Sequence, residues 1–309
     1  MGIIKDSLTF DDVTLIPSFS SILPSEAITT TDLGQKLRLK IPLMSSAMDT
    51  VTEAKMAIAL SKAGGLGVIH RNLSIESQVK EVKKVKRSKC IVGAAIGVSE
   101  KDLERAIELN KADVDLLIID TAHGHTTKVS KMIKNVKKKI SRVNLCAGNI
   151  ATGKAAKFLA DSGADIVKVG IGPGSICTTR LVAGIGVPQL SAIIDVKKSL
   201  RNYKTKIISD GGIKFSGDLA KGLAAGADCI MIGSLFSGTN ESPGKIIKIK
   251  GKLYKNFRGM GSVGAMSVGS SDRYYQKKYK DISKYVPEGV EGLVKYKGQV
   301  SKIIYNLVG

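Results

Sequence analysis

The chain has 309 residues, and its 48 basic and 27 acidic side chains give it a formal net charge of +21. This length can bury a sizeable core, in one large α/β domain or in two smaller ones. The charge favours anionic partners, nucleotides or nucleic acids, without choosing between them. The four cysteines form no CxxC pair, which indicates a reducing compartment. No apolar stretch is long enough to cross a bilayer and the N-terminus lacks a signal peptide, so we expect a cytoplasmic protein.

Eight short apolar runs alternate with helix-like segments along the chain. Such runs between amphipathic helices predict a parallel sheet covered on both faces. Eight of these units predict closure into a (β/α)8 barrel. An open doubly wound sheet is the alternative, but its GxGxxG signature after the first strand is absent. The predicted strands are residues 41–44, 66–69, 91–96, 116–119, 143–146, 166–169, 206–209 and 229–232.

Local signals support several of the helices. Ser99 and Asp102 form a capping-box-like start. Glycines mark the ends of three helical stretches, at Gly64, Gly163 and Gly226. Lysine-rich runs at 80–87 and 131–139 fall on predicted outer helices, and no aromatic residues interleave with them. These runs therefore indicate solvated helix faces, and we do not expect nucleic-acid binding.

A glycine-rich loop with one cysteine follows the predicted strand 166–169. Gly170, Gly172 and Gly174 let a ligand approach the backbone, and such a loop offers amides to an anion or carbonyls to a cation. Cys177 has polar and basic neighbours, a setting that favours the thiolate. The alternative is a tight structural turn that holds an inert cysteine.

Polar residues and glycines gather where the predicted strands end, and in a barrel this end carries the active site. The loops after the seventh and eighth strands often bind phosphate, and here they contain Gly211, Gly212, Gly233 and Ser234. Asp210 could accept hydrogen bonds from a ribose diol, or it could be an Asx-turn residue. The other polar strand ends are 45–49, 70–72, 120–124 and 148–149.

The connection after the eighth strand is unusually long. Residues 238–296 show no regular period but many glycines and an Arg273-Tyr274 pair. Such a connection is typical of a functional flap, and its alternative is a surface linker. Residues 297–308 then form the predicted closing helix.

Taken together, these stretches make the chain resemble the IMP dehydrogenase family over nearly its whole length. The glycine–cysteine loop alone is shared with GMP reductase, which is similar in fold, whereas the Arg273-Tyr274 pair in a long flap resembles the dehydrogenase only. The matching stretches are 8–13 (LTFDDV), 45–50 (SSAMDT), 170–180, 210–212 (DGG), 258–261 (RGMG) and 272–274 (DRY).

The resemblance implies a (β/α)8 barrel, a homotetramer and a defined reaction. Inosine 5′-monophosphate (IMP), NAD and water would give xanthosine 5′-monophosphate (XMP) and NADH, the committed step of guanine nucleotide biosynthesis. A monovalent cation, normally potassium, would assist. A non-catalytic nucleotide-binding or nucleic-acid-binding protein is an alternative of another class, suggested by the charge alone.

The resemblance also implies roles for individual residues. Cys177 would be the nucleophile, and Thr179, Arg273 and Tyr274 would activate water. The substrate would bind at Ser46, Met48, Asn149, Ser175, Asp210, Gly212, Gly233, Ser234, Met260, Gly261 and Glu288. NAD would contact Asp120, Thr121, Ala122 and Gly170. The cation would bind at carbonyls of Gly172, Gly174 and Cys177.

The chain departs from the family pattern in three places. The family usually inserts regulatory CBS modules between the second helix and the third strand. Here residues 87–90 lead directly from the predicted helix into the next predicted strand, so we expect this module to be missing. We therefore expect one catalytic domain, residues 1–309, with the flap 238–296 inside it. Family members also continue beyond the last helix, with a tail that completes a neighbouring subunit's cation site. Lys168 stands where an arginine is frequent.

Overall fold

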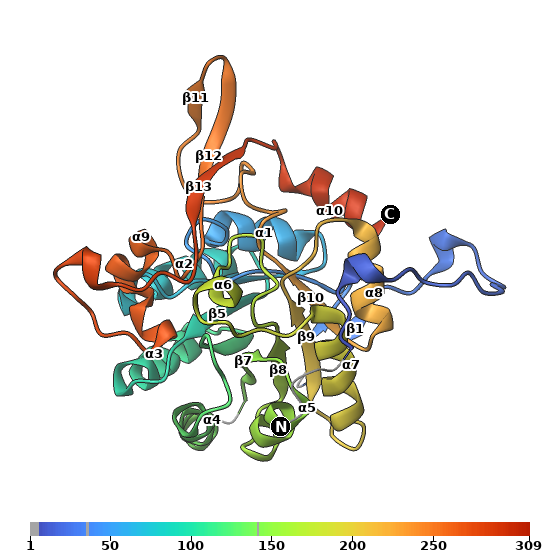
Figure 1. Cartoon of the computed structure of the whole chain (residues 1–309), viewed down its shortest axis with the longest axis horizontal. Coiled ribbons are helices and arrows are strands. Elements are labelled where there is room, and N and C mark those ends of the chain that lie inside the picture. The colour runs from blue at the N-terminus through green and yellow to red at the C-terminus, as the bar shows by residue number, and fades with distance from the viewer. Residues whose placement is uncertain (1–5, 35–36, 141) are drawn as a thin grey trace.

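A computed structural model describes residues 6–34, 37–140 and 142–309 of the chain. Eight parallel strands close into a barrel in the order β10-β3-β4-β5-β6-β7-β8-β9 (Figure 1). The fold is therefore the predicted (β/α)8 barrel, and the open-sheet alternative is wrong. The strands are β3 (Leu43–Ser45), β4 (Leu66–Ile69), β5 (Val92–Ile96), β6 (Leu116–Asp120), β7 (Asn144–Ile150), β8 (Ile166–Val169), β9 (Lys206–Asp210) and β10 (Cys229–Ile232).

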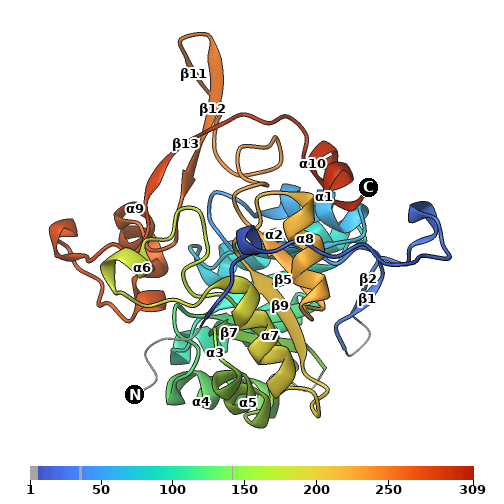
Figure 2. The same cartoon turned by 45° about the vertical axis from the view of Figure 1, so that its right-hand side comes forward.

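Helices surround the barrel and pack on its outer face (Figures 1 and 2). Ser99 and Asp102 form the expected capping box at the start of α3, and the three helix-ending glycines all have positive φ. The lysine-rich runs lie on α2 and α4, as predicted. The outer helices are α1 (Ala54–Lys62), α2 (Ile75–Arg87), α3 (Glu100–Lys111), α4 (Thr127–Lys139), α5 (Gly153–Asp161), α7 (Gln189–Ser199), α8 (Ser216–Ala224) and α10 (Val300–Val308).

Two apolar layers hold the barrel together. One layer joins the outer strand faces to the helices. The other contains alternate strand residues such as Val68, Ile118 and Met231, which point inward. Cys146 and Cys229 belong to this inner layer, and burial raises the pKa of both thiols, so they are packed as small hydrophobes. The short strands β1 (Thr31–Asp32) and β2 (Arg38–Leu39) and the residues next to them add three leucines to it, Leu33, Leu37 and Leu39.

The junction between α2 and β5 is short. Helix α2 ends at Arg87, strand β5 begins at Val92, and four residues, 88–91, connect them. Lys89 takes a positive φ of 56° to make this turn. No further domain stands at this point of the described chain.

The long connection after β10 contains more regular structure than its sequence suggested. Strands β11 (Ile247–Ile249), β12 (Lys252–Arg258) and β13 (Glu291–Lys295) form an antiparallel sheet, and the β11–β12 hairpin projects away from the barrel (Figures 1 and 2). These strands are largely exposed and rich in lysine, so they form no apolar run that would reveal them.

Irregular turns lie between β12 and β13. They begin with α9 (Val263–Ala265), continue through a π-helical turn at Met266–Ser270, and reach the 3-10 turns η4 (Ser271–Tyr274) and η5 (Ile282–Lys284). Helix α10 follows, three residues later than predicted. We call residues 262–275 the flap arm.

The N-terminal region packs on the barrel and then leaves it. Phe10, in the 3-10 turn η1 (Phe10–Asp12), is buried. The chain then runs outward as an arm through η2 (Pro24–Glu26) (Figure 2), with Ile16 and Phe19 more than 85% exposed. Among the described residues, no helix combines the length and apolarity needed to cross a membrane.

Candidate active site

A cavity opens at the C-terminal ends of the barrel strands. Loops after β3, β6, β8, β9 and β10 line it, together with Asn149 of β7 and parts of the segment 238–296. Every site residue predicted from the sequence lines this cavity except Thr121. The structure therefore brings together groups that lie far apart in the sequence.

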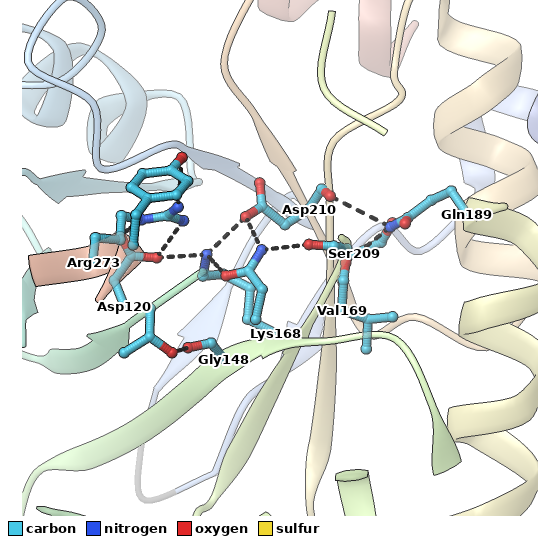
Figure 3. Close-up of polar contacts among 12 residues, drawn as sticks. Asp120, Gly148, Lys168, Val169, Gln189, Ser209, Asp210 and Arg273 are labelled. Carbon is cyan, nitrogen blue, oxygen red and sulfur yellow. Dashed lines mark hydrogen bonds and ion pairs between the residues drawn. The ribbon is translucent and has the colours of Figure 1, made fainter. Parts of the chain in front are cut away.

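Thr121 has a different place from the one predicted. It is buried, and its amide and hydroxyl both donate to the Gly148 carbonyl, at 3.0 and 2.8 Å. This ties the end of β6 to β7 (Figure 3). Thr121 is thus a support beneath Asp120 and Ala122, which do face the cavity.

The cysteine loop is held from two sides. Strand β8 anchors its start, and the short helix α6 (Thr179–Val182) begins just after Cys177. The amide of Thr178 donates to the Glu288 carbonyl at 3.0 Å, so the returning chain of the segment 238–296 braces the loop. The half-buried Cys177 thiol donates to Thr179 Oγ1 at 3.2 Å.

The side of the cavity near β7 and β9 carries a tightly placed carboxylate. Asn149 Nδ2 donates to Asp210 Oδ2 at 2.9 Å and to the Gly170 carbonyl at 2.8 Å. Gly170 has a φ of +154°, and a Cβ there would lie 2.0 Å from the Asp210 carbonyl oxygen. Only glycine fits this contact, which packs the cysteine loop directly against β9.

Adjacent glycine loops follow β9 and β10, which are neighbours in the barrel. Gly211 and Gly212 both have positive φ, 95° and 85°, and Gly233 and Ser234 line the cavity beside them. Exposed loop amides with a lysine nearby suit a phosphate group. The nearby lysine is Lys214, which also lines the cavity.

A buried lysine joins two of the cavity's carboxylates, Asp120 and Asp210 (Figure 3). The Lys168 ammonium lies 3.0 Å from Asp120 Oδ1 and 2.7 Å from Asp210 Oδ2, and it also donates to Asn149 Oδ1. Lys168 is 3% exposed. Burial lowers its pKa, but the two carboxylates outweigh burial and raise the pKa above its usual value. Lys168 is therefore charged at neutral pH.

Arg273 completes this cluster from the flap arm. Its Nε and Nη2 donate to the two Asp120 oxygens at 2.7 and 3.0 Å, and its Nη1 donates to the Tyr274 hydroxyl at 3.2 Å. The Ala122 amide donates to the Arg273 carbonyl at 2.9 Å. Burial lowers the pKa of Arg273, but the Asp120 carboxylate raises it by more, so this pKa lies above its ordinary range. In this arrangement Arg273 is a cation.

The cysteine loop also offers carbonyl oxygens. The Gly174 carbonyl accepts from the Cys177 amide at 3.2 Å. Within the part of the chain that the structure describes, the Gly172 and Cys177 carbonyls accept no hydrogen bond. Hard cations take oxygen ligands, so these carbonyls are of the donor type that a monovalent cation needs. Across the described ranges, no group of three or more His, Cys, Asp or Glu side chains forms a separate metal site.

Lys168 is the functional residue that the sequence prediction missed. The resemblance marked it only as a substitution, whereas the structure places it at the centre of the charge cluster. One signal could have revealed it: it is the single charged residue in the apolar strand 166–169. A charge inside a buried parallel strand needs a partner, because an unpaired buried charge is costly.

Comparisons with known proteins identify the family. The family model of the IMP dehydrogenase / GMP reductase domain matches residues 7–309. The inosine-5′-monophosphate dehydrogenase of Borreliella burgdorferi is 47% identical over 99% of this chain and 88% of its own length. That of Cryptosporidium parvum is 45% identical over 99% and 86%, and that of Aquifex aeolicus 37% over 99% and 88%.

The alignments are longer than the chain. They extend over 357 positions with the Borreliella burgdorferi protein and 435 with the Aquifex aeolicus protein, against 309 residues here. These relatives thus contain residues without a counterpart in this chain. The match of a whole barrel, with its strand-end residues gathered in one cavity, shows that the chain belongs to the IMP dehydrogenase / GMP reductase family.

Proposed function

We propose that this chain oxidises IMP to XMP with NAD, through a covalent intermediate on Cys177. One observation carries the proposal. A cysteine, a carboxylate suited to ribose and two glycine loops suited to phosphate share one cavity, which matches the parts of a purine nucleotide. The names of the relatives favour the same reaction.

The first half of the reaction uses the cysteine loop. The Cys177 thiolate adds to C2 of the purine, and the resulting tetrahedral carbon releases its hydride. NAD, when bound, accepts that hydride. Asp210 and Asn149 would hold the ribose, and the loop amides after β9 and β10 would hold the phosphate. A thioimidate then remains on Cys177.

The expected cofactor site and the flap arm share two residues. Asp120 and Ala122 are the residues expected to contact NAD, and here both are bonded to Arg273. Asp120 ends β6 and offers a carboxylate, Ala122 offers a backbone amide, and both line the cavity, which fits a nicotinamide riboside beside the cysteine loop. We propose that Arg273 and the cofactor take turns at Asp120.

The second half hydrolyses the thioimidate, and the flap arm would serve it. Water adds to C2, the carbon–sulfur bond breaks, and XMP leaves with the Cys177 thiol restored. Thr179, Arg273 and Tyr274 all line the cavity. Because Arg273 is held as a cation on Asp120, a base role requires that it first release this carboxylate. Its reference pKa exceeds about 12, so Tyr274 and Thr179 would share the proton transfer.

Further properties complete the proposal. We propose a single catalytic domain without CBS modules, with residues 238–296 as its flap, and a potassium ion on the carbonyls of Gly172, Gly174 and Cys177. The exposed apolar arm that contains Ile16 and Phe19 supports assembly into a homotetramer, because such side chains are commonly covered by a partner. We propose a cytoplasmic location from the unpaired cysteines.

The decisive experiment follows absorbance at the wavelength of NADH. Mixing the protein with IMP and NAD should produce NADH. The second candidate, a GMP reductase, is favoured only by the shared family domain, and it would instead consume NADPH with GMP and release ammonia. Activity in the second assay alone would replace the proposal. Salt-sensitive nucleic-acid binding without either activity would indicate the non-catalytic alternative.

A further inference from the structure

An ion pair fastens the flap arm one residue before Arg273. Arg71 follows the end of β4, and its Nη1 donates to Asp272 Oδ2 at 2.9 Å. The two partners differ in exposure: the Arg71 side chain is 7% exposed and that of Asp272 is 47% exposed. Arg71 is therefore part of the barrel rim, and Asp272 is the group that arrives from outside.

A second arginine stands beside the first. Arg105, on α3, donates to Gln78 Oε1 at 2.7 Å and to the Leu73 carbonyl at 3.0 Å. The pKa of Arg105 lies below its ordinary value, first because the side chain is buried and then because of the Arg71 guanidinium. The carboxylates of Asp102 and Asp272 act in the opposite direction and raise this pKa. Two buried guanidinium groups thus repel each other, and the flap arm's Asp272 reduces that repulsion.

The same rim loop touches the flap arm again. Asn72 Nδ2 lies 3.5 Å from the Ala265 carbonyl. A Cβ on Gly269 would lie 3.3 Å from Asn72 Oδ1, so the arm passes close to this side chain. Among residues 6–34, 37–140 and 142–309, Asp272 supplies the one carboxylate within ion-pair distance of Arg71. The rim after β4 is thus a preformed seat for the arm.

We propose that Arg71 is a positioning residue for Arg273, acting through Asp272. The inference rests on the proposed role of Arg273 in hydrolysis. Asp272, Arg273 and Tyr274 share the turn η4, so seating Asp272 on Arg71 aims the next side chain at Asp120. Arg71 does not line the cavity itself, and its effect reaches the reaction only through the arm.

Because Arg71 is buried and Asp272 is half exposed, we expect substitutions of the two residues to differ in their cost to stability. Arg71→Met removes a buried charge together with its repulsion of Arg105. Asp272→Asn leaves that charge buried without its counter-ion, which is the costlier change. Each should loosen the arm, and the double variant should loosen it no more than Asp272→Asn alone, because both act on one contact.

Residue-resolved hydrogen exchange tests the seating without any substrate. The Ala122 amide is bonded to the Arg273 carbonyl, so its exchange reports release of the arm from the barrel, and the Tyr275 amide is bonded to the Asp272 carbonyl, so its exchange reports loosening of the turn η4 within the arm. Arg71→Met and Asp272→Asn should speed exchange at both amides about 5- to 30-fold, and Arg71→Lys should restore part of the protection. Lys86→Met is the matched control. It breaks a 3.0 Å pair with Asp115 away from the arm and should change neither amide.

Kinetics test the consequence for the reaction. In Arg71→Met, the first-turnover burst of NADH should persist, while steady-state turnover falls by a similar 5- to 30-fold factor, about that of one or two kcal/mol. Unchanged exchange at Ala122 would overturn the proposal, as would equal loss of burst and steady state. Arg273→Ala, measured in parallel, isolates the proposed function: normal hydrolysis there would remove Arg273 from catalysis whatever the exchange data show.

Discussion

The barrel and the segment 238–296 are held in place by different forces. The strands β4, β5, β6, β8 and β10 are buried at every position, whereas β13 is largely exposed and β12 is only partly buried. The flap arm is docked by two ion pairs, Arg273 on Asp120 and Asp272 on Arg71, and by a small apolar contact through the buried Ala265 and Met266. Apolar burial is strong and non-directional, while ion pairs are directional and contribute less net stability. A rigid rim can therefore hold a segment that it can also release.

The largest effect should come from the rigid side of this comparison. Cys177→Ala removes the only thiol in the cavity, and NADH formation should fall roughly 10⁴- to 10⁶-fold, as when other covalent nucleophiles are removed. Absorbance of NADH measures the loss, and circular dichroism should show an intact fold. Cys229→Ala is the control, because Cys229 packs inside the barrel, and its chemical step should stay in place.

The flap side is tested by Arg273→Ala. If Arg273 serves hydrolysis alone, the first turnover should still release a rapid burst of NADH. Steady-state turnover should drop about 10²- to 10⁴-fold, the usual cost of removing a general base. Mass spectrometry of the quenched protein should show the adduct on Cys177. Equal loss of burst and steady state would instead place Arg273 in substrate binding or hydride transfer.

Among the described residues Lys168 bonds only those of the barrel, but it shares Asp120 with Arg273 of the flap arm, so its loss should affect the whole charge cluster. Lys168→Met leaves Asp120 and Asp210 facing each other without their shared cation, and removing one partner of a buried pair costs about 3–5 kcal/mol. Chemical denaturation should show that decrease in the free energy of unfolding. Lys137→Met, which breaks a partly exposed pair with Asp165, should cost about 1 kcal/mol or less. Similar losses in both variants would mean that the cluster has no special stability.

The charges of the cluster also predict a pH window. Burial raises the pKa of Asp120, but Arg273 and Lys168 overcome this and lower it below its ordinary value. Its contribution is thus full above about pH 4 and is lost as pH falls further. The pKa of Lys168 is raised, so its contribution is full below about pH 10.4 and is lost above that pH. Asp120→Asn should therefore destabilise the fold by a constant amount from about pH 5 to 9 and by less in acid.

The same division explains what the sequence could predict. Strand 166–169 was predicted because three of its four residues are apolar and it lacks the apolar–polar alternation of a half-exposed strand. The structure confirms it as β8, which is buried at every position. Strand β12 was missed because polar residues, Lys252, Lys255, Asn256 and Arg258, interrupt its apolar ones without a period of two, and because it stands partly in solvent. Local periodicity reports burial, so it reveals elements that are buried and misses those that are docked by charge.

The candidate site divides in a similar way. Cys177 and Asp210 could be placed because one lies in the loop after β8 and the other ends β9, and strand ends meet in a barrel. Thr121 was misplaced because position after a strand does not tell whether a side chain faces the cavity or the neighbouring strand. The contact between Arg71 and Asp272 spans 201 residues, and no local pattern records a pairing at that separation.

The smallest predicted effect tests whether the arm needs a close fit as well as charge. A Cβ on Gly261 would lie 2.7 Å from Cζ of Tyr274 and 3.0 Å from the Glu288 carbonyl carbon. Gly261→Ala should therefore push the Tyr274 ring away, and because small misplacements of reacting groups are costly, hydrolysis should slow about tenfold. Gly292→Ala on β13, where a Cβ would meet no atom within 4 Å, is the control. Slower steady-state turnover of Gly261→Ala with a retained burst of NADH would locate the defect in the arm. If both variants turn over normally, Tyr274 can shift without loss, and hydrolysis does not need a close fit at Gly261.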